Sequence, residues 1–357
     1  MQEAVLDGKK VGCYNINMIR KKGKAVLSVL CALFALTVCS AFFTGCTYYE
    51  FPDVPPREGY LRTEDIRIRD ISVLVADGKY YMYGMYPCSL EDGGYACYVS
   101  DDLLYWEEEP HDVFLKTWDG SFEGTSCFWA PEVHEYKGRY YLFGSYQSAE
   151  TGRRGTSVFV ADDPLGPFEE LSDGHITPHE WNCIDGTLYV DEDGVPWMAF
   201  VHEWVDEGEG SMCVVRLSDD LSRTEGEVKT VFYAKDPFWS DNKVTDAPYF
   251  YKTSGGELLM IWSNSDLFDN YAIGIARSDN GRPDGEWSHD AIPLYSRNFT
   301  YAEDGGHGVI FEDLNGDLVL GFHSPGFVEK EGEFERAYFY RLEDTGDSLA
   351  IAERYFE

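Results

Sequence analysis

Residues 129–145 read WAPEVHEYKGRYYLFGS, and this stretch decides the fold. An extended run is followed by a Lys-Gly turn and then by an aromatic run, which is the composition of two strands joined in a hairpin. The same plan recurs four times in the chain. RDISVLVADGKYYMYGM begins at residue 69, DGTLYVDEDGVPWMAFVHE at 185, DAPYFYKTSGGELLMIWSN at 246 and GHGVIFEDLNGDLVLGFHS at 306. The chain therefore contains five units with one strand pattern.

The five units have nearly constant spacing. We take their polar opening residues as equivalent positions, and these follow one another after 62, 53, 61 and 61 residues: Asp70, Glu132, Asp185, Asp246 and His307. A third strand follows each hairpin, near residues 95, 156, 212, 271 and 336. Five repeats of about four strands each predict an all-β fold, the five-bladed β-propeller.

The repeat also predicts where the polar residues gather. The two strands of a hairpin are antiparallel, so the start of the first lies beside the end of the second. We therefore expect the opening residues at one face of the ring, near its axis. The residues that end the second strands should join them: Tyr86, Tyr146, His202, Glu203, Trp262, Asn264 and His323.

The N-terminal 45 residues are predicted to be a signal peptide rather than part of the fold. The basic run RKKGK at 20–24 precedes an apolar run at 25–43, and Gly45 stands before Cys46. This ending resembles a bacterial lipobox with Cys46 as the lipidated residue; the alternative is an ordinary transmembrane anchor. Met18 fits a signal start better than Met1, which indicates a mis-assigned start for residues 1–17.

The expected organisation follows from this segment. We predict an exported bacterial lipoprotein, anchored to the membrane through Cys46 and facing the periplasm or the cell surface. Residues 46–60 are Pro-rich and polar without periodicity, which is typical of a tether. Residues 61–357 should form the propeller domain, and we expect it to be a monomer.

Charge and cysteine content narrow the class of partner. The whole chain carries a formal charge of −35, and without the predicted signal, which contributes +4, it carries −39. Such a charge argues against nucleic acid and against acidic polymers, and a neutral polysaccharide is the easier partner. Five cysteines follow Cys46, with no metal spacing and no CxxC. We expect buried thiols; the alternative is one disulfide, whose pairing the sequence does not reveal.

The carboxylates at the predicted axis point to one chemistry. Glycoside hydrolysis needs two carboxyl groups on opposite sides of the bond, and an inverting enzyme leaves room for water between them. A third carboxylate nearby raises the pKa of the acid, because like charges resist joint ionisation. Asp70, Asp185 and Asp246 supply three such groups. A single Asp at a strand start is more often a turn residue, but three at repeat positions beside a histidine favour catalysis.

Several motifs resemble glycoside hydrolase family 43, whose members are five-bladed propellers that act on arabinans, xylans and related glycans. The motifs are IRIRD followed by GKYYMYG, WAPEV, ID before a DEDG turn, TDAP, and GGHG. By this resemblance Asp70 is the general base and Asp185 raises the pKa of the acid and orients it. The resemblance makes His307 the axial residue beside a central metal, often calcium, and makes Glu132 a support residue near the site.

One position departs from the family pattern. The family commonly has Glu in an EGP or EAP motif as the acid, whereas this chain has Asp246 in TDAP. Asp is one methylene shorter, and a misplacement of roughly 1.5 Å can cost about 100-fold in rate. Either the pocket has moved inward, or another residue protonates the leaving group, or the protein does not hydrolyse. Glu203 is the best substitute, since it follows a second strand on the same face.

The remaining candidates would bind the sugar. Aromatic rings stack on sugar faces, so Trp129, Trp204 and Trp262 are candidates for the substrate site, together with His202 and Glu132; for the tryptophans the alternative is packing between blades. The sequence thus predicts an inverting glycosidase for a neutral plant-type glycan, like an arabinofuranosidase, an arabinanase or a β-xylosidase. The alternatives are a carbohydrate-binding lipoprotein that has lost the acid, and a phosphorylase or transferase of the same fold.

Overall fold

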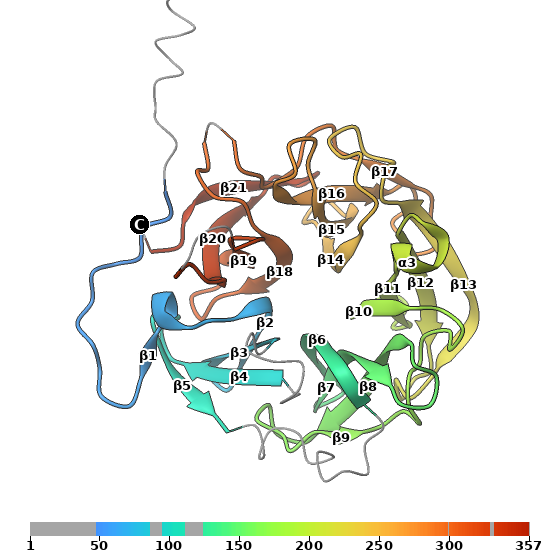
Figure 1. The fold of residues 1–357 in the computed structure, drawn as a ribbon, viewed down its shortest axis with the longest axis horizontal. Coiled ribbons are helices and arrows are strands. Elements are labelled where there is room, and N and C mark those ends of the chain that lie inside the picture. The colour runs from blue at the N-terminus through green and yellow to red at the C-terminus, as the bar shows by residue number, and fades with distance from the viewer. Residues whose placement is uncertain (1–47, 86–94, 111–123, 299, 329–331, 357) are drawn as a thin grey trace, which may run out of the picture. The chain divides into compact units, whose positions relative to one another are not determined.

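The computed structural model describes residues 48–85, 95–110, 124–298, 300–328 and 332–356. These residues form five antiparallel sheets arranged as blades around an axis, as predicted (Figure 1). In each blade four strands follow one another from the axis outward in chain order, and in the first blade a short strand from earlier in the chain pairs outside the fourth. The described helices are short: a 3₁₀ turn at Thr63–Asp65 and α3 at Trp204–Glu207.

The first three blades follow the chain in order. Blade I consists of β2 (Arg69–Ala76), β3 (Lys79–Met85), β4 (Tyr95–Ser100) and β5 (Tyr105–Glu109), with β1 (Leu61–Arg62) paired outside β5. Blade II consists of β6 (Gly124–Tyr136), β7 (Arg139–Ser148), β8 (Arg154–Ala161) and β9 (Glu169–Glu170). Blade III consists of β10 (Cys183–Val190), β11 (Pro196–His202), β12 (Ser211–Leu217) and β13 (Thr224–Tyr233).

The last two blades complete the ring. Blade IV consists of β14 (Asp246–Lys252), β15 (Leu258–Ser265), β16 (Tyr271–Ser278) and β17 (Trp287–His289). Blade V consists of β18 (Gly306–Glu312), β19 (Leu318–Ser324), β20 (Arg336–Asp344) and β21 (Leu349–Arg354). The third strands β4, β8, β12, β16 and β20 begin at or within two residues of the predicted positions.

The innermost strand of every blade has a β-bulge near its start. In each, two residues face one residue of the second strand, and the first of the two has a positive φ. These first residues are Asp70 (53°), Ala130 (47°), Asp185 (56°), Ala247 (51°) and His307 (56°). A bulge re-aims a side chain. The left-handed conformation strains most residues, and Asp, Asn and His adopt it more readily than others.

The positions of the bulges show that two of the five units were aligned incorrectly from the sequence. Asp70, Asp185 and His307 are equivalent, as predicted, but the residues that match them in blades II and IV are Ala130 and Ala247. Glu132 lies two residues beyond the bulge position, and Asp246 lies one residue before it. The prediction was wrong there because it aligned the units on polar side chains, whereas the backbone repeat places alanine at two of the five positions.

Hydrophobic clusters fill the spaces between neighbouring blades. One cluster joins blades I and II, and others join II to III, III to IV, IV to V, and V back to I. Trp262 and Phe232 lie in the cluster between blades III and IV, with ring centroids 5.0 Å apart. The high aromatic content of the chain therefore serves packing between blades.

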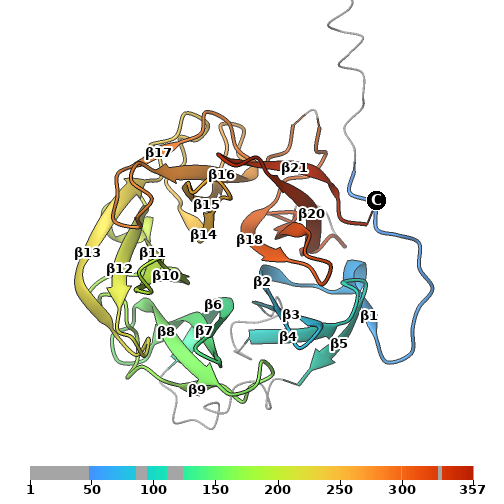
Figure 2. The same ribbon diagram turned by 180° about the vertical axis from the view of Figure 1, so that it is seen from behind.

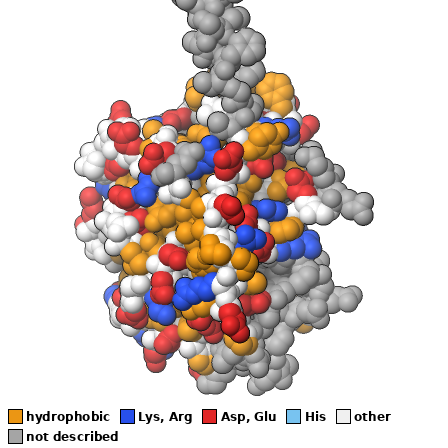
Figure 3. Space-filling view, turned by 90° about the vertical axis from the view of Figure 1, so that its left-hand side faces the viewer, with side chains coloured by type: hydrophobic (Ala, Val, Ile, Leu, Met, Phe, Trp, Pro, Cys, Tyr) orange, Lys and Arg blue, Asp and Glu red, His pale blue; other side chains and the backbone are white. Residues whose placement is uncertain are grey.

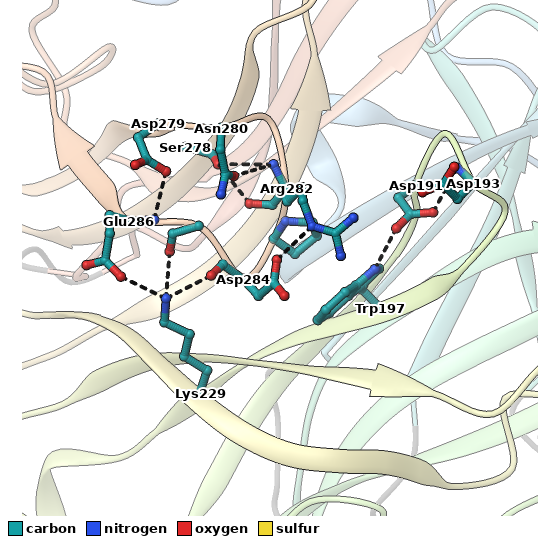
Figure 4. Close-up of polar contacts among 12 residues, drawn as sticks. Asp191, Asp193, Trp197, Lys229, Ser278, Asp279, Asn280, Arg282, Asp284 and Glu286 are labelled. Carbon is teal, nitrogen blue, oxygen red and sulfur yellow. Dashed lines mark hydrogen bonds and ion pairs between the residues drawn. The ribbon is translucent and has the colours of Figure 1, made fainter.

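Polar contacts lock the outer part of the interface between blades III and IV (Figure 4). Lys229 of β13 donates to the carbonyl oxygens of Asp284 and Gly285 at 2.8 and 3.1 Å, and its ammonium pairs with Glu286 at 2.9 Å. Arg282 lies over the ring of Trp197, 5.9 Å from its centroid. The loop between β16 and β17 is thus attached to the neighbouring blade.

The ring closes where blade V meets blade I (Figure 2). Ile68, just before β2, donates its backbone N–H to the carbonyl oxygen of Glu335 at 3.0 Å. On the side of the molecule where these blades lie, acidic, basic and hydrophobic side chains are interspersed, so the acidic excess does not form one patch there (Figure 3).

The described part of the predicted tether docks on blade V. The ring of Tyr49 stacks on Tyr338 with centroids 4.1 Å apart, and its hydroxyl donates to the carbonyl oxygen of Phe339 at 3.1 Å. Further along, the Tyr105 hydroxyl donates to the carbonyl oxygen of Pro55 at 2.6 Å. The low periodicity of this stretch was therefore misleading: it packs through single aromatic residues rather than through a repeating face.

The predicted signal peptide and Cys46 lie outside the described residues. In the part of the chain that is described, no helix is long and apolar enough to cross a membrane. Cys97, Cys127, Cys183 and Cys213 are buried free thiols, as predicted; Cys88 lies outside the described residues.

Candidate active site

The bulges bring three polar side chains together at the axis. His307 Nδ1 lies 3.3 Å from Asp70 Oδ1 and 4.0 Å from Asp185 Oδ2, so blades I, III and V meet at one cluster. All three side chains are largely buried. At the matching positions blades II and IV have Ala130 and Ala247, whose side chains carry no polar group.

Hydrogen bonds from the bulges fix the backbone at the axis. The N–H of the bulge residue donates to a side chain on the second strand of the preceding blade. The three bonds of this kind are Asp70 N–H to His323 Nδ1 (3.1 Å), Asp185 N–H to Ser145 Oγ (3.0 Å) and His307 N–H to Ser263 Oγ (2.8 Å). The strained conformation of each bulge is thus held by its neighbour.

Blade IV uses a different acceptor. By analogy with the other bulges, the Ala247 N–H should donate to a side chain on β11 of blade III. The equivalent residue there is Val201, which pairs with Ile184 and whose side chain has no hydrogen-bond acceptor. Instead the Ala247 N–H donates to Asp185 Oδ2 at 2.9 Å. Asp185 therefore fixes the backbone next to Asp246.

Asp70 is set up to be ionised. Burial alone would raise the pKa of this carboxyl, but the charge of Arg69, together with His307 and His323, lowers it to about 2. Arg69 Nε lies 3.4 Å from Asp70 Oδ1. An anion at neutral pH that lies in a buried site can accept a proton from water.

Asp246 is set up to be protonated. Burial raises the pKa of its carboxyl, and so does the negative charge of Asp70. The Tyr271 hydroxyl and Arg69 lower this pKa, and the combined effect places it at about 7. Tyr271 donates this hydrogen bond to Oδ2 at 3.2 Å. Burial, followed by the charges of Asp246 and Asp70, also raises the pKa of Asp185 well above its usual value. Carboxyl groups with pKa values driven apart mark acid and base roles.

Glu203 lies near the cluster with a cation as partner. Its Oε2 lies 2.5 Å from Nε of Arg154, and its charge contributes to the raised pKa values of Asp185 and Asp246. The Arg154 guanidinium lies 5.4 Å from the ring centroid of Trp129. This ion pair already engages the Glu203 carboxylate, whereas the Asp246 carboxyl accepts a hydrogen bond from the neutral Tyr271 hydroxyl.

Glu132 is engaged in structural contacts. Its carboxylate accepts a hydrogen bond from the Thr187 hydroxyl of blade III and lies 2.5 Å from His134 Nε2. It therefore joins blades II and III beneath the axis layer, which fits a support residue better than a sugar-binding one.

The other predicted sugar-binding residues are placed as follows. Trp262 is fully buried between blades, and no face of its ring is open to a sugar; this prediction was wrong. His202 is also buried, stacked on Trp181 at 4.2 Å, with Nε2 3.1 Å from Asp206. Trp204 is partly exposed, and Lys243 Nζ covers one face of its ring at 3.3 Å. Trp129 is partly exposed in β6 and remains a candidate.

Arg69 and Tyr271 were not predicted from the sequence. Arg69 could have been noticed because it directly precedes Asp70. Tyr271 starts a third strand, and its ring reaches Asp246 only because two glycines leave room. A Cβ at Gly306 or Gly326 would come within 2.3 Å of Tyr271 atoms.

We predict that Tyr271→Phe shifts the pH profile of activity. The hydroxyl stabilises the ionised form of Asp246, so its loss raises the pKa of the acid. Activity requires protonated Asp246 and falls as pH rises through about 7 in the wild type. In the variant the fall should occur at a pH higher by about one to two units, the equivalent of one hydrogen bond to a charged group.

The measurement is kcat/KM against pH for Tyr271→Phe and for Tyr295→Phe. Tyr295 is the control because it is a buried tyrosine whose hydroxyl donates to a backbone carbonyl, that of Glu303. If the fall of kcat/KM at high pH is unchanged in Tyr271→Phe, or shifts equally in Tyr295→Phe, Tyr271 does not set the pKa of the acid.

The chain is similar to several known proteins. The chain resembles a solved endo-arabinase structure from Bacteroides thetaiotaomicron, with a TM-score of 0.72 and 34% identity over 82% of this chain and 100% of that one. It is 26% identical to a probable arabinan endo-1,5-α-L-arabinosidase C of Aspergillus clavatus, over 82% of this chain and 91% of that one.

A further relative matches over a shorter length. The extracellular exo-α-(1→5)-L-arabinofuranosidase of Cellvibrio japonicus is 29% identical over 145 residues, which are 36% of this chain and 39% of that protein. The chain thus spans about two fifths of the length of that relative. The family model of glycosyl hydrolases family 43 matches residues 65–336, from the 3₁₀ turn before blade I to the start of β20, and the chain belongs to this family.

Proposed function

We propose that this protein hydrolyses glycosidic bonds of neutral plant glycans with inversion at the anomeric carbon. The observation that carries the proposal is the arrangement of two largely buried carboxyl groups at the axis. Asp70 lies 3.4 Å from Nε of Arg69, whose charge lowers the pKa of this carboxyl to about 2. Asp246 accepts a hydrogen bond from the Tyr271 hydroxyl at 3.2 Å, and burial and the charge of Asp70 raise its pKa to about 7. At neutral pH one group is a base while the other still carries a proton in an appreciable fraction of molecules.

Each side chain has one role in the proposed reaction. Asp70 accepts a proton from a water molecule as the water oxygen bonds to the anomeric carbon. Asp246 donates its proton to the oxygen of the leaving sugar as the glycosidic bond breaks. Asp185 accepts the Ala247 N–H and so holds the backbone beside Asp246, while burial and the charge of Asp70 raise the pKa of Asp246. Tyr271 fixes the orientation of the Asp246 carboxyl.

Arabinose-containing polymers are the first substrate to test, with xylose-containing ones second. Support comes from the similar proteins, whose names describe arabinan-cleaving enzymes, and from the endo-1,4-β-xylanase of Bacteroides thetaiotaomicron, a solved structure with 27% identity. The acidic balance of the chain favours an uncharged polymer.

The test is a panel of arabinan, arabinoxylan, xylan and aryl glycosides with the purified domain. Release of reducing sugar from at least one neutral polymer is expected. If no member is cleaved but oligosaccharides bind, the protein is a carbohydrate-binding lipoprotein. If cleavage requires phosphate, it is a phosphorylase.

A central calcium ion is a separate proposal. In the described part of the chain no three His, Cys, Asp or Glu side chains are grouped so that they could hold a metal, so the protein alone does not supply a calcium site. Burial lowers the pKa of His307, so its ring is neutral and has a nitrogen lone pair that can accept a hydrogen bond from a water ligand of the ion. Water would supply the remaining ligands of calcium.

We expect the purified domain to contain about one calcium ion per chain and to lose activity with a chelator, since the ion would hold His307 and its waters in place. Elemental analysis, followed by chelation and calcium addition, measures this. No bound metal, with activity unchanged by chelator and by calcium, would remove calcium from the proposal.

Lipid anchoring at Cys46 is likewise proposed from the sequence. Only Thr47 and Tyr48 separate Cys46 from Tyr49, whose ring is buried on blade V. The propeller would therefore be held close to its anchor rather than at the end of a long tether. Mass spectrometry of the mature N-terminus, with Cys46→Ala as the control, tests this.

A further inference from the structure

We propose that Phe238, Phe268 and Phe327 form a platform that binds sugar units of a polysaccharide chain beyond the cleaved bond. The proposal rests on the hydrolase function above, and it adds a site that neither the motifs nor the axis residues indicate. It makes the protein an enzyme of long chains rather than of short glycosides.

All three rings stand on the face of the ring that holds the axis carboxylates. The loop that carries Phe238 leads from β13 to the start of β14, where Asp246 lies. Phe268 lies between β15 and β16, and Phe327 between β19 and β20. Second strands end, and first and third strands begin, at that face (Figure 1). The platform therefore shares its face with the proposed acid.

The three rings are unusually exposed. Phe238 is 89% exposed, Phe268 is 83% exposed and Phe327 is 56% exposed. Two aliphatic neighbours, Leu267 and Val328, are 55% and 42% exposed. Single exposed apolar residues are common, but several large ones on the loops of one face indicate a binding surface.

The loops hold Phe268 and Phe238 in place. Asp266 Oδ1 accepts the Phe268 N–H at 2.8 Å, and its Oδ2 accepts the Ser296 hydroxyl at 2.5 Å. The Leu267 N–H donates to the carbonyl oxygen of Trp239 at 3.0 Å, which joins this loop to the one that carries Phe238. Rings presented by fixed loops lose little freedom on binding, so contact with a ligand is more favourable.

Phe327 connects the platform to the catalytic centre. Its ring centroid lies 6.1 Å from that of Tyr271, and Tyr271 donates to Asp246 at 3.2 Å. Gly326 permits this approach, because a Cβ there would lie 2.3 Å from Tyr271 Cβ. One side chain thus separates the proposed acid from the first exposed ring, and a sugar chain leaving the axis on this side would cross the platform.

The chemistry of the surface favours an uncharged sugar chain. Phenylalanine faces offer apolar area to the C–H faces of sugar rings, and they need no hydrogen-bond match to each unit. Asp266 and Asp269 lie in the same loop as Phe268, within a chain of net charge −35. An anionic polymer would be repelled, whereas a neutral arabinan or xylan would not.

The experiment compares a triple variant, Phe238→Ala/Phe268→Ala/Phe327→Ala, with the wild type on a polymer and on an aryl glycoside. Each lost ring should weaken polymer binding roughly 2- to 10-fold, so KM for the polymer should rise at least about 10-fold in the triple variant. The value of kcat/KM for the aryl glycoside should fall much less than the affinity for the polymer, because that substrate does not reach Phe238 or Phe268. Leu314→Ala is the control, since Leu314 is 42% exposed in the β18–β19 turn on the opposite face.

Polymer binding is also measured directly, by calorimetry in the Asp70→Asn background, where the polymer is not consumed. A triple variant that loses polymer affinity there supports the platform even if the wild type hydrolyses nothing, an outcome that would contradict only the proposed function. Unchanged polymer affinity, or equal losses on both substrates, would overturn the platform. Analytical ultracentrifugation gives a further test. A wild type that is dimeric and a triple variant that is monomeric would also overturn the platform, because the rings would then belong to an interface between copies.

Discussion

Replacing Asp70 by Asn should lower kcat on a natural glycan by about 10²- to 10⁴-fold, the range typical of a general acid or base. The amide cannot accept the proton of the attacking water. Asn adopts the left-handed conformation of the bulge about as readily as Asp, so the backbone at φ 53° and its bond to His323 should persist. The loss should therefore be catalytic rather than structural.

Two measurements distinguish a catalytic loss from a structural one. Circular dichroism and thermal unfolding of Asp70→Asn should show a folded propeller. Asp313→Asn is a matched control, because Asp313 is a buried carboxylate in the β18–β19 turn that accepts the backbone N–H groups of Asn315 and Asp317. The control should keep activity near that of the wild type. If Asp70→Asn retains more than about 10% of the wild-type rate, Asp70 is not the base.

Replacing Asp246 by Asn should remove nearly all activity on a natural glycan but much less on an activated aryl glycoside. A sugar alkoxide needs a proton as it leaves, whereas a dinitrophenolate hardly does. The structure favours Asp246 as this donor because burial and the charge of Asp70 raise its pKa to about 7, while Glu203 is paired with Arg154 at 2.5 Å. We expect a loss of about 10²- to 10⁴-fold on the glycan.

Glu203→Gln, assayed on the same two substrates, is the comparison. It should reduce activity on both in similar proportion, because it removes a charge near the site and leaves Arg154 without its carboxylate. If only Glu203→Gln shows the dependence on the leaving group, the proton donor is Glu203. The shorter Asp246 side chain would then serve the site through its charge alone.

The sequence was sufficient to predict the five-bladed ring and three of the five bulge residues at its axis. The five hairpins repeat at nearly constant spacing, and Asp70, Asp185 and His307 are polar at matching positions. Their side chains can be aligned from the chain alone because Asp and His also tolerate the positive φ of the bulge. The bulge itself leaves no signal where its residue is alanine, and this explains why Asp246 and Glu132 were misaligned.

The remaining parts of the site depend on packing between distant segments. Trp262 was expected at the axis face, but its neighbour Ser263 is the residue whose hydroxyl reaches His307, and alternation along β15 turns Trp262 into the core. Tyr271 reaches Asp246 because Gly306 and Gly326 leave room for its ring. This space around the Tyr271 ring depends on three segments that are distant in sequence, so no local sequence pattern predicts it.

The stereochemistry of the first product tests the central claim most directly. The wild type is mixed with the polymer or oligosaccharide that it cleaves best, and the anomeric protons are followed by NMR before mutarotation. Water activated by Asp70 on the side opposite the leaving group predicts that the first-formed sugar has the inverted anomeric configuration. Retention of configuration would mean that a carboxylate forms a covalent intermediate, and it would contradict the roles given to Asp70 and Asp246.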